Sequence, residues 1–319
     1  MSQWKFSFRV SRIVPVCATV LFLWGALVWY GGDWVAKERV QKLTTNEGEI
    51  LAERADALAY NLHRYLAFLH ALPTHIAADS AVIKALLAHR DGSEKLPSDV
   101  RAKTARWMAN SELSSLSQEL KRENGQFETD ITWVINNIGD CIASSNSDTP
   151  ENFVGTNYRD RDYFVMTTKG RLGHQFAVGR KTGVPGIYFS SPVMDGTVFL
   201  GSVVIKVNVD KIAPLIGSAD SLVTDEYGVV VISRRPALYL RAMPNQRLEE
   251  LSPEARDLRY RRRNLEPLEI EPWEHWSGMF HFDKREAPYL IATRSEIAEG
   301  LSVHVMDELV EVEKFIEIF

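Results

Sequence analysis

The chain has 319 residues, of which 45% are hydrophobic and 25% charged, and its formal net charge is −5. This is an ordinary globular composition, and the length allows two domains. A mildly negative chain without a broad basic face is not expected to bind nucleic acid. Its one dense basic run, Arg259 with Arg261–Arg263, is flanked by acidic residues and is interpreted as a solvated loop.

Metal and disulfide chemistry find little support in the sequence. The two cysteines, Cys17 and Cys141, lie far apart, and neither a CxxC pair nor an HExxH motif occurs. We therefore expect no disulfide framework, no metal site and no bound cofactor.

The N-terminus resembles a membrane anchor. Lys5, Arg9 and Arg12 precede an uncharged apolar run of 18 residues at 13–30. Such a run is long enough to cross a hydrocarbon core of about 30 Å as a helix, and the basic flank favours a cytoplasmic N-terminus. A cleavable signal peptide is the alternative, but its apolar core is usually shorter and no small-residue cleavage site follows. We expect a retained transmembrane helix, with the chain after about residue 31 outside the cytoplasm.

Helical patterns fill the next part of the chain. From residue 34 to 72, apolar residues recur at steps of three and four, which predicts one long helix ended by Pro73. Shorter helices are predicted at about 80–90 and 98–123, separated by a loop that contains glycine and proline.

Strand signals begin at residue 131 and occur in two sets. Each set reads as a strand, a turn, a second strand, a helix and then further strands. The sets cover about 131–208 and 221–306, and the helix inserted between strands favours an α+β fold with two small lobes along the long helix. Expected strands are ITWVIN, CIASS, HQFAVG, GIYFSSPVM and VFLGSVVIKVNV in the first set, and SLVT, VVVIS, SGMFHFD, APYLIATRS and LSVHVM in the second.

The order of these parts resembles the double Cache (PAS-like) extracellular sensor domain. The sequence motifs are most similar to those in the periplasmic part of bacterial sensor kinases for four-carbon dicarboxylates. Four stretches carry the resemblance: ASSNSDTPENFVGTNYRDRDYF, GIYFSSPV, GSVVIKVNVDKI and LVTDEYGVVVISRRP. It implies a periplasmic sensor, anchored in the bacterial inner membrane, that controls a cytoplasmic kinase, cyclase or methyl-accepting domain. It also makes a homodimer along the long helix plausible.

The resemblance implies a division of the chain into six parts. These are a cytoplasmic N-terminus at 1–12, a transmembrane helix at 13–30, a stalk and helical segment at 31–125, a membrane-distal ligand-binding lobe at 126–210, a membrane-proximal lobe at 211–306, and a C-terminal helix at 307–319 that leads to a second membrane span.

Arg161 and Lys206 are the main site candidates. Arg161 follows Tyr158 by three positions, which we interpret as one turn at the start of a helix, where free amides also favour an anion. Lys206 lies in a valine-rich strand, where alternation puts it on one face with Ser202 and Val204. An arginine fork and a lysine point charge suit the two ends of a small dicarboxylate.

Lys206 also has a structural interpretation. A buried lysine is costly unless something neutralises it, so it could lie at the exposed end of an edge strand, or pair with Asp160 or Asp162. The resemblance favours the ligand interpretation, because Arg161 and Lys206 fall on the positions that the family uses for its anions.

Four further residues are weaker candidates for ligand binding. Tyr158 and Tyr163 could donate hydroxyls, although aromatic residues there are as often simple core. Thr182 and Ser190 fall where the family places small hydroxyl donors. Arg159 is expected to point away from the pocket.

The sequence departs from the family pattern at several positions. Asp162 stands where the family has proline after the motif arginine, Arg180 and Lys181 replace small hydroxyl residues, and Ile187 replaces a typical tyrosine. The extra cations would suit a more highly charged anion, or would simply be solvated. A small anionic ligand is therefore expected, and a dicarboxylate is one example.

Other functions remain open at this point. A membrane-anchored hydrolase would use Ser144 or Ser145 with a histidine, but no GxSxG motif is present. The chain could instead be the sensory region of a diguanylate cyclase or chemoreceptor with another small ligand. It could also sense a partner protein while its distal lobe stays empty.

Overall fold

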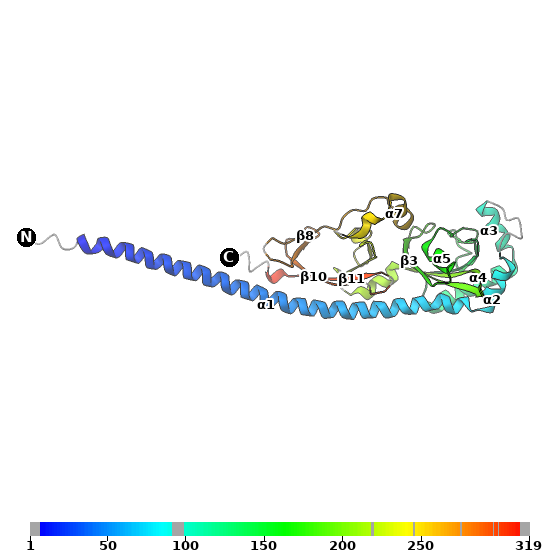
Figure 1. Ribbon diagram of the computed structural model, residues 1–319, viewed down its shortest axis with the longest axis horizontal. Helices are drawn as coiled ribbons and strands as arrows, with labels where there is room; N and C mark the ends of the chain where they lie inside the picture. Colours follow the sequence, from blue (N-terminus) through cyan, green and yellow to red (C-terminus); the bar gives the residue numbers. More distant parts are fainter. Residues whose placement is uncertain are drawn as a thin grey trace, which may run out of the picture.

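The protein is an α+β molecule in which two antiparallel sheets lie along one long helix, α1 (Ser7–Ala77). In the computed structural model (Figure 1), α1 runs beneath both lobes and extends beyond the proximal one at its N-terminal end. The structure describes residues 7–90, 99–217, 220–244, 246–274, 276–295, 297–298 and 300–312, and within α1 the side chains at 7–14 and 16 lie outside the description.

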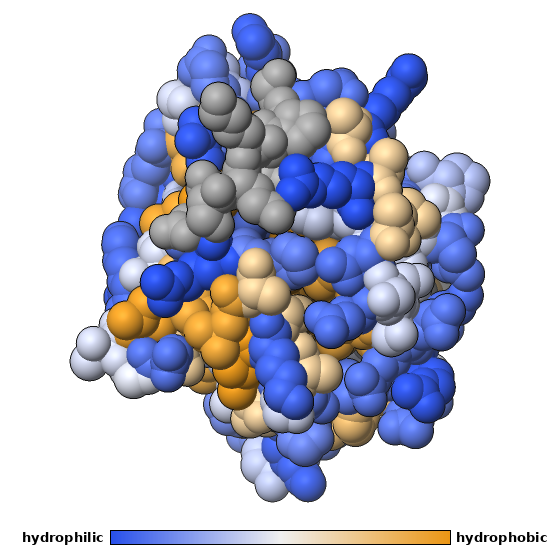
Figure 2. All heavy atoms as spheres, turned by 90° about the vertical axis from the view of Figure 1, so that its right-hand side faces the viewer, coloured by the Kyte–Doolittle hydropathy of each residue, from blue (hydrophilic) through white to orange (hydrophobic). Residues whose placement is uncertain are grey.

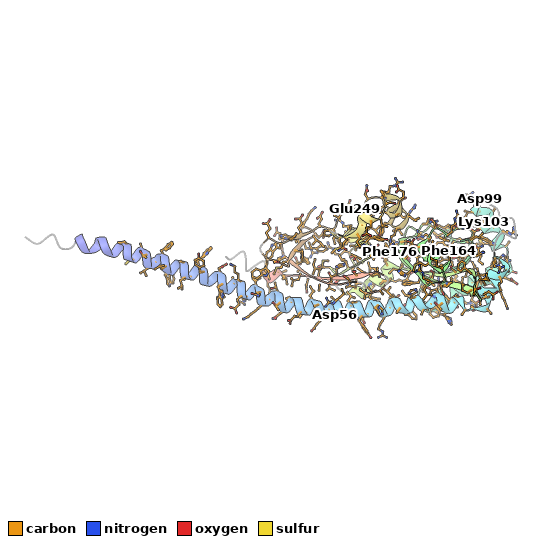
Figure 3. The ribbon with its side chains drawn as sticks, in the orientation of Figure 1. Asp56, Asp99, Lys103, Phe164, Phe176 and Glu249 are labelled. Carbon is orange, nitrogen blue, oxygen red and sulfur yellow. The ribbon has the colours of Figure 1, made fainter. Side chains whose placement is uncertain are left out.

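The face of α1 turned to the lobes carries the predicted apolar pattern. Leu51, Ala55, Leu62, Leu66 and Leu69 are all at most 2% exposed and belong to the main hydrophobic core. Because these spacings return to the same side of a helix, the stretch from 34 to 72 is helical as predicted. Polar contacts add to this packing at Asp56, which forms an ion pair with Arg294 of the proximal lobe (Figure 3).

The predicted end of this helix at Pro73 is wrong, since α1 continues to Ala77. A proline removes one helical hydrogen bond and crowds the preceding turn. Here Leu72, Ile76 and Ala77 are buried in the core on either side of it. Their burial offsets the lost bond and holds the last turn in helical form.

The proposed membrane anchor coincides with the N-terminal part of α1. Residues 17–30 are helical and largely exposed. The side chains at 13, 14 and 16 of the predicted 13–30 span, and all those of the predicted cytoplasmic segment 1–12, lie outside the description. Over the described residues no single helix has both the length and the apolar character to cross a membrane. One bent pair, Cys17–Ala77 with Ser80–Ala88, has them by length and composition alone.

Three helices cover the distal end of the molecule, the face seen in Figure 2, which is largely hydrophilic with a smaller apolar area. The helix predicted at 98–123 is in fact two helices. Asn110 breaks it, because its side chain accepts hydrogen bonds from the amides of Glu112 and Leu113 and so caps a new helix. The three helices are α2 (Ser80–Ala88), α3 (Val100–Met108) and α4 (Ser111–Phe127).

The distal lobe is a five-stranded antiparallel sheet of order β2-β1-β5-β4-β3, so that β5 is central. All five predicted strands are present, and a two-residue turn at Gly196–Thr197 joins β4 to β5. The elements are β1 (Ile131–Asn136), β2 (Cys141–Ser144), the short helix α5 (Asp162–Thr167), β3 (Gly173–Val178), β4 (Pro185–Asp195) and β5 (Val198–Asn208).

The two faces of this sheet have different neighbours. On β5, Val203, Ile205 and Val207 belong to the core shared with α1, whereas Val204 packs in an aromatic cluster on the opposite face. This is the alternation predicted for the strand. Lys206 therefore projects from the face that does not contact α1.

The proximal lobe repeats this architecture with one additional edge strand, in the order β7-β6-β11-β10-β9-β8. The predicted strands are confirmed and β8 was not predicted. The helix expected between the strands of this set, for which no residues were predicted, is α7. The connection from the distal lobe is α6 (Val209–Ile212) and a 3-10 turn at 213–216. The lobe contains β6 (Leu222–Thr224), β7 (Val230–Ser233), 3-10 turns at 236–238 and 247–250, α7 (Pro253–Tyr260), β8 (Ile270–Pro272), β9 (Phe280–Phe282), β10 (Tyr289–Arg294) and β11 (Ser302–Glu308).

Two predictions for this half of the chain need correction. Arg259 does not lie in a solvated loop: it is 9% exposed in α7 and forms ion pairs with Asp225 and Glu226. The following Arg261–Arg263 are exposed, as expected. The strand β11 reaches Glu308, so the helix predicted at 307–319 does not begin at 307, and 313–319 lie outside the described residues.

Candidate ligand-binding site

The distal sheet carries a box of aromatic side chains on the face away from α1. Trp133 of β1 lies at its centre, with its ring centroid 5.2 Å from Phe153, 5.9 Å from Tyr158, 6.0 Å from Tyr163 and 5.9 Å from Tyr188. Several of these pairs meet edge to face, the arrangement that ring quadrupoles favour. The result is a buried, rigid wall at the site.

Lys206 lies against this box, directly opposite Tyr188 on the neighbouring strand and 1% exposed. Its Nζ is 5.9 Å from the Tyr188 ring centroid and donates to the carbonyl of Val184 (2.9 Å) and the hydroxyl of Thr182 (3.4 Å). Burial disfavours the ammonium charge and lowers the pKa of Lys206 to about 8, and the charge of Asp130 opposes this only in part.

The structural interpretation of Lys206 is therefore wrong in both forms. The lysine lies on the central strand β5, and neither Asp160 nor Asp162 neutralises it. Asp160 accepts from Arg180 (2.6 Å), and Asp162 accepts from Gln175 (3.0 Å). Within the described part of the chain, no carboxylate lies within 4.0 Å of the Lys206 ammonium.

Glycines on the neighbouring segments make room for this arrangement. A Cβ at Gly186 would lie 2.5 Å from Cε of Lys206, and a Cβ at Gly179 would lie 2.2 Å from the hydroxyl of Thr182. Both distances are well inside van der Waals contact. The lysine can therefore cross β4 and reach the 179–184 loop only because these two positions lack side chains.

Arg161 approaches the same box from the start of α5. It is 2% exposed, and its guanidinium carbon is 5.7 Å from the Tyr188 ring centroid and 6.0 Å from that of Tyr163. Its Nη1 donates to the carbonyl of Leu258 at 3.1 Å. As for Lys206, no carboxylate of the described chain lies within 4.0 Å of it.

The predicted helical turn from Tyr158 to Arg161 is wrong. The helix α5 begins only at Asp162, and the amide of Arg161 donates to the carbonyl of Tyr158 (3.0 Å) in a turn that precedes it. Both side chains nevertheless reach the aromatic box, because the turn brings positions three apart to the same side.

The two cations thus share one aromatic neighbour. Because each charge lies within cation–π distance of the Tyr188 ring, they are at most about 12 Å apart. Two buried positive charges near one another repel, and each has lost much of its hydration. An anion between them would relieve both effects.

The remaining predicted residues divide into two groups. Tyr158 and Tyr163 are buried, and neither hydroxyl has a hydrogen-bond partner; burial raises the pKa of both. Thr182 joins them at the site through Lys206. Ser190 is also buried, but its hydroxyl donates to the Tyr163 carbonyl (2.8 Å), so it holds α5 on the sheet and is not free for a ligand.

The positions that depart from the family pattern lie around the site and not in it. Arg180 is neutralised by Asp160, and Lys181 donates to the carbonyl of Asn152. Ile187 faces α1 in the main core, and it is the next residue, Tyr188, that faces the site. Arg159 is exposed, as predicted.

Trp133 and Tyr188 are the site residues that sequence reasoning missed. The indole Nε1 of Trp133 is buried and has no hydrogen-bond partner, which makes it a third unused donor beside the two tyrosine hydroxyls. The position of Tyr188 could be predicted in part, since strand alternation places Tyr188 and Ser190 on one face of β4. Which face that is depends on the pairing of β4 with β5, and strand patterns do not specify that pairing.

A hydrolase site would need a reactive serine, and a metal site would need a cluster of histidine, cysteine or acidic side chains. Ser144 donates to Asn146 (2.6 Å), and the hydroxyl of Ser145 accepts from the Asn124 side chain and the Thr132 amide. Both serines proposed for a hydrolase thus have structural partners. Among the described residues, no group of three or more histidine, cysteine, aspartate or glutamate side chains could hold a metal ion.

The chain is similar in sequence to known proteins over part of its length. No family model matches the chain. It is 32% identical over 119 residues to the C4-dicarboxylate transport sensor protein DctB of Pseudomonas aeruginosa, and 29% identical over 169 residues to the protein of the same name from Rhizobium meliloti. These matches cover 37% and 52% of this chain but only 19% and 24% of the relatives, so the chain spans a small part of their length.

The solved structures decide the fold. The sensor domain of the V. cholerae histidine kinase DctB superposes with a TM-score of 0.68 at 20% identity, covering 85% of this chain and 99% of that domain. The chain has a double Cache sensor fold. The same fold extends to the ligand-binding domain of the Campylobacter jejuni chemoreceptor Tlp3, solved with L-valine, at a TM-score of 0.54 and 9% identity, with 86% and 97% of the two chains covered. The resemblance inferred from sequence motifs is therefore confirmed.

Proposed function

We propose that this chain is the extracytoplasmic sensor region of a bacterial transmembrane receptor, and that its distal lobe binds a small organic anion such as a four-carbon dicarboxylate. One observation carries the proposal: Arg161 and Lys206 are buried at one aromatic box, and no acid of the described chain pairs with either. Burying unpaired charges costs several kcal/mol, roughly, unless a partner compensates.

A dianion suits this pair of groups. The planar guanidinium of Arg161 can hold one carboxylate through two parallel hydrogen bonds, and the ammonium of Lys206 can hold the other as a point charge. The free donors of Trp133, Tyr158 and Tyr163 can bond the remaining oxygens. A zwitterionic amino acid fits less well, because the charged groups in contact with the rings of the box are cations.

The receptor as a whole is inferred from the relatives. Both curated relatives are named as C4-dicarboxylate sensors, which supports a sensor histidine kinase that is anchored in the inner membrane and exposes this region to the periplasm. A second copy is proposed to pack along α1, where Ile50, Tyr60 and Phe68 are exposed. A chemoreceptor or cyclase output, and a partner-sensing module with an empty pocket, are the alternatives.

The test is calorimetry on the purified chain with succinate, malate, citrate and a panel of amino acids. We expect at least one dicarboxylate to bind and to raise the melting temperature, since a ligand of the native state stabilises it. Arg161→Ala and Lys206→Ala should each abolish binding, while Arg159→Ala, which removes an exposed arginine two residues away, should not.

Two results would count against the proposal. A well-folded chain that no anion binds would favour the partner-sensing alternative. Equal affinity of the wild type and both site variants would place the ligand elsewhere.

A further inference from the structure

The proximal lobe reaches the candidate site through α7. This helix lies above the junction of the two lobes, next to the inner end of β3 (Figure 1). Its Tyr260 is fully buried, and the ring lies 6.2 Å from that of Phe176 on β3, a residue labelled at the junction in Figure 3. The last turn of α7 is thus packed against the distal sheet.

A polar contact joins the same turn to the site. Leu258 is in the last turn of α7, where carbonyl groups have no amide partner within the helix and carry the negative end of its dipole. Nη1 of Arg161 donates to this carbonyl at 3.1 Å. The proximal lobe therefore supplies a hydrogen-bond acceptor for the Arg161 guanidinium.

An ion cluster within the proximal lobe holds α7 in this place. Arg259 contacts Glu226 (2.8 Å) and Asp225 (3.6 Å), and its ring neighbours include Tyr227 at 5.1 Å. Asp225 is 3% exposed and also accepts the hydroxyl of Tyr260 (2.5 Å). Arg259 and Tyr260, the two residues that follow Leu258, are thereby tied to Asp225 and Glu226.

The cluster also extends across the junction. Nη1 of Arg259 lies 4.0 Å from the carboxylate of Asp162, which is the residue that follows Arg161 and the one that stands in place of the proline of the resembled family. The same oxygen of Asp162 also accepts a hydrogen bond from the side chain of Gln175 on β3 (3.0 Å). Both the side chain and the chain neighbour of Arg161 are therefore in contact with α7.

Arg161 can hold α7 and an anion at the same time. A guanidinium has five N–H donors in a plane, and the bond to Leu258 uses one of them. The guanidinium therefore has further N–H groups that can bind a carboxylate.

We propose that α7 of the proximal lobe positions Arg161 for the anion, so that residues outside the distal lobe set the affinity of the distal site. This inference rests on the proposed anion-binding function. Linkage requires the effect to be reciprocal: an anion bound to Arg161 must strengthen the docking of α7 by the same factor. The proximal lobe then responds to occupancy of the distal site through α7, in addition to any response of α1.

The experiment compares variants of Arg259 and Tyr260 in the full chain, with succinate as the probe. Arg259→Gln removes the charge that fixes α7, and Tyr260→Phe removes only the hydroxyl that bonds Asp225 while keeping the contact with Phe176. We expect the Kd for succinate to rise by about 5- to 20-fold in Arg259→Gln and by a smaller factor in Tyr260→Phe. Arg262→Gln, an exposed arginine three residues further along, is the matched control and should leave the Kd unchanged.

A second measurement separates positioning from a loss of stability. Hydrogen exchange of peptides that cover 253–260 should slow when succinate is added to the wild type, and this response should be lost in Arg259→Gln. Arg259→Lys, which keeps the charge, should restore part of the affinity. If Arg259→Gln does not fold, Tyr260→Phe and Arg259→Lys carry the comparison.

The outcomes are distinguishable. Succinate binding that is equal in the wild type and in the folded α7 variants, or no change in α7 exchange on binding, overturns the positioning role and leaves the anion site intact. A wild type that binds neither succinate nor malate overturns the dicarboxylate function itself, together with the inference that rests on it.

Discussion

The distal and proximal lobes have sheets of matching strand order, but they differ in whether acidic side chains pair with their cations. The distal order β2-β1-β5-β4-β3 corresponds to β7-β6-β11-β10-β9 in the proximal lobe. In the distal lobe, Arg161 and Lys206 are buried, and no acid of the described chain pairs with them. In the proximal lobe, Arg235 is paired with Asp220 (3.1 Å) and with Asp283.

The same contrast holds for a second proximal arginine. Arg285 lies 3.3 Å from Glu308 and 3.7 Å from Asp220, and it donates to the hydroxyl of Tyr289 (2.5 Å). The proximal lobe thus supplies its own carboxylates where the distal lobe has none. A shared fold therefore does not imply a shared binding site. A cation of these lobes is available to bind an anionic ligand only where no carboxylate of the protein already neutralises it.

Removal of the distal lysine should have the largest effect on binding. Lys206→Met keeps the length of the side chain but removes the charge, and we expect the Kd for succinate to rise by roughly 100-fold or more, as for loss of a charge-assisted contact. Stability should be unchanged or higher, because no acid of the described chain is left unpaired. Calorimetry and denaturant unfolding measure the two effects. Lys211→Met, which removes a partly exposed lysine near Asp130, is the control.

Acid should weaken the protein through the proximal lobe. His304 is buried between the hydroxyls of Thr224 and Thr293, and burial lowers its pKa to about 4 from an ordinary 6.5. The unfolded chain therefore binds a proton that the folded one excludes, and stability falls as the pH drops through 6.5 towards 4. The loss attributable to this group is about 2 kcal/mol at pH 5.

Urea unfolding between pH 7 and 5 checks the acid prediction. In His304→Gln, which can still bond both threonines, this part of the pH dependence should be absent. An unchanged acid profile in the variant would assign the loss to other groups.

Alkali should weaken binding through the distal lobe. Lys206 loses its proton above about pH 8, so the affinity for succinate should fall about tenfold per pH unit beyond that point. The sign for folding is the opposite: between pH 8 and 10.5 the unfolded chain holds more protons than the folded one, and stability rises. Calorimetry at pH 7 and 9 tests the binding effect. A ligand affinity that does not change over this range would show that Lys206 stays charged or does not bind the anion.

The smallest effect is expected from the paired proximal arginine. Arg235→Ala removes one ion pair from Asp220, which keeps its contact with Arg285, and another from Asp283. Because these side chains are partly exposed, the expected loss of stability is only about 1 kcal/mol. The Kd for succinate should stay within about twofold of the wild type. A large loss of ligand affinity in this variant would mean that the proximal lobe takes part in binding more directly than α7 alone implies.

The outcome of the strand predictions shows which patterns are reliable. The alternation in 198–208 identified β5 and placed Lys206 on the correct face, because a half-buried strand has a period of two that tertiary packing must respect. The short strand β8 was missed, and the helix expected in the second set was not located at α7. The side chains of both elements are largely polar or charged and leave no apolar period to recognise.

Charged residues were the hardest to place from sequence. Arg259 and Arg262 belong to one basic run, yet the first is buried in an ion cluster and the second is exposed. Lys206 and Arg180 both lie near the aromatic box, and only Arg180 has an acid partner. A charge pattern states which residues carry charge, but the partner that neutralises each one comes from a distant part of the chain.

The sequence by itself determined the two-lobed α+β architecture, the long helix and the candidates Arg161 and Lys206, because apolar periodicity and short motifs are local properties. Only the tertiary structure decided that both cations lie beside Tyr188, which packs against Trp133, that the Ser190 hydroxyl bonds a backbone carbonyl, and that α7 contacts Arg161. Strand order and lobe docking bring these groups together, and both depend on contacts between residues that are far apart in the chain.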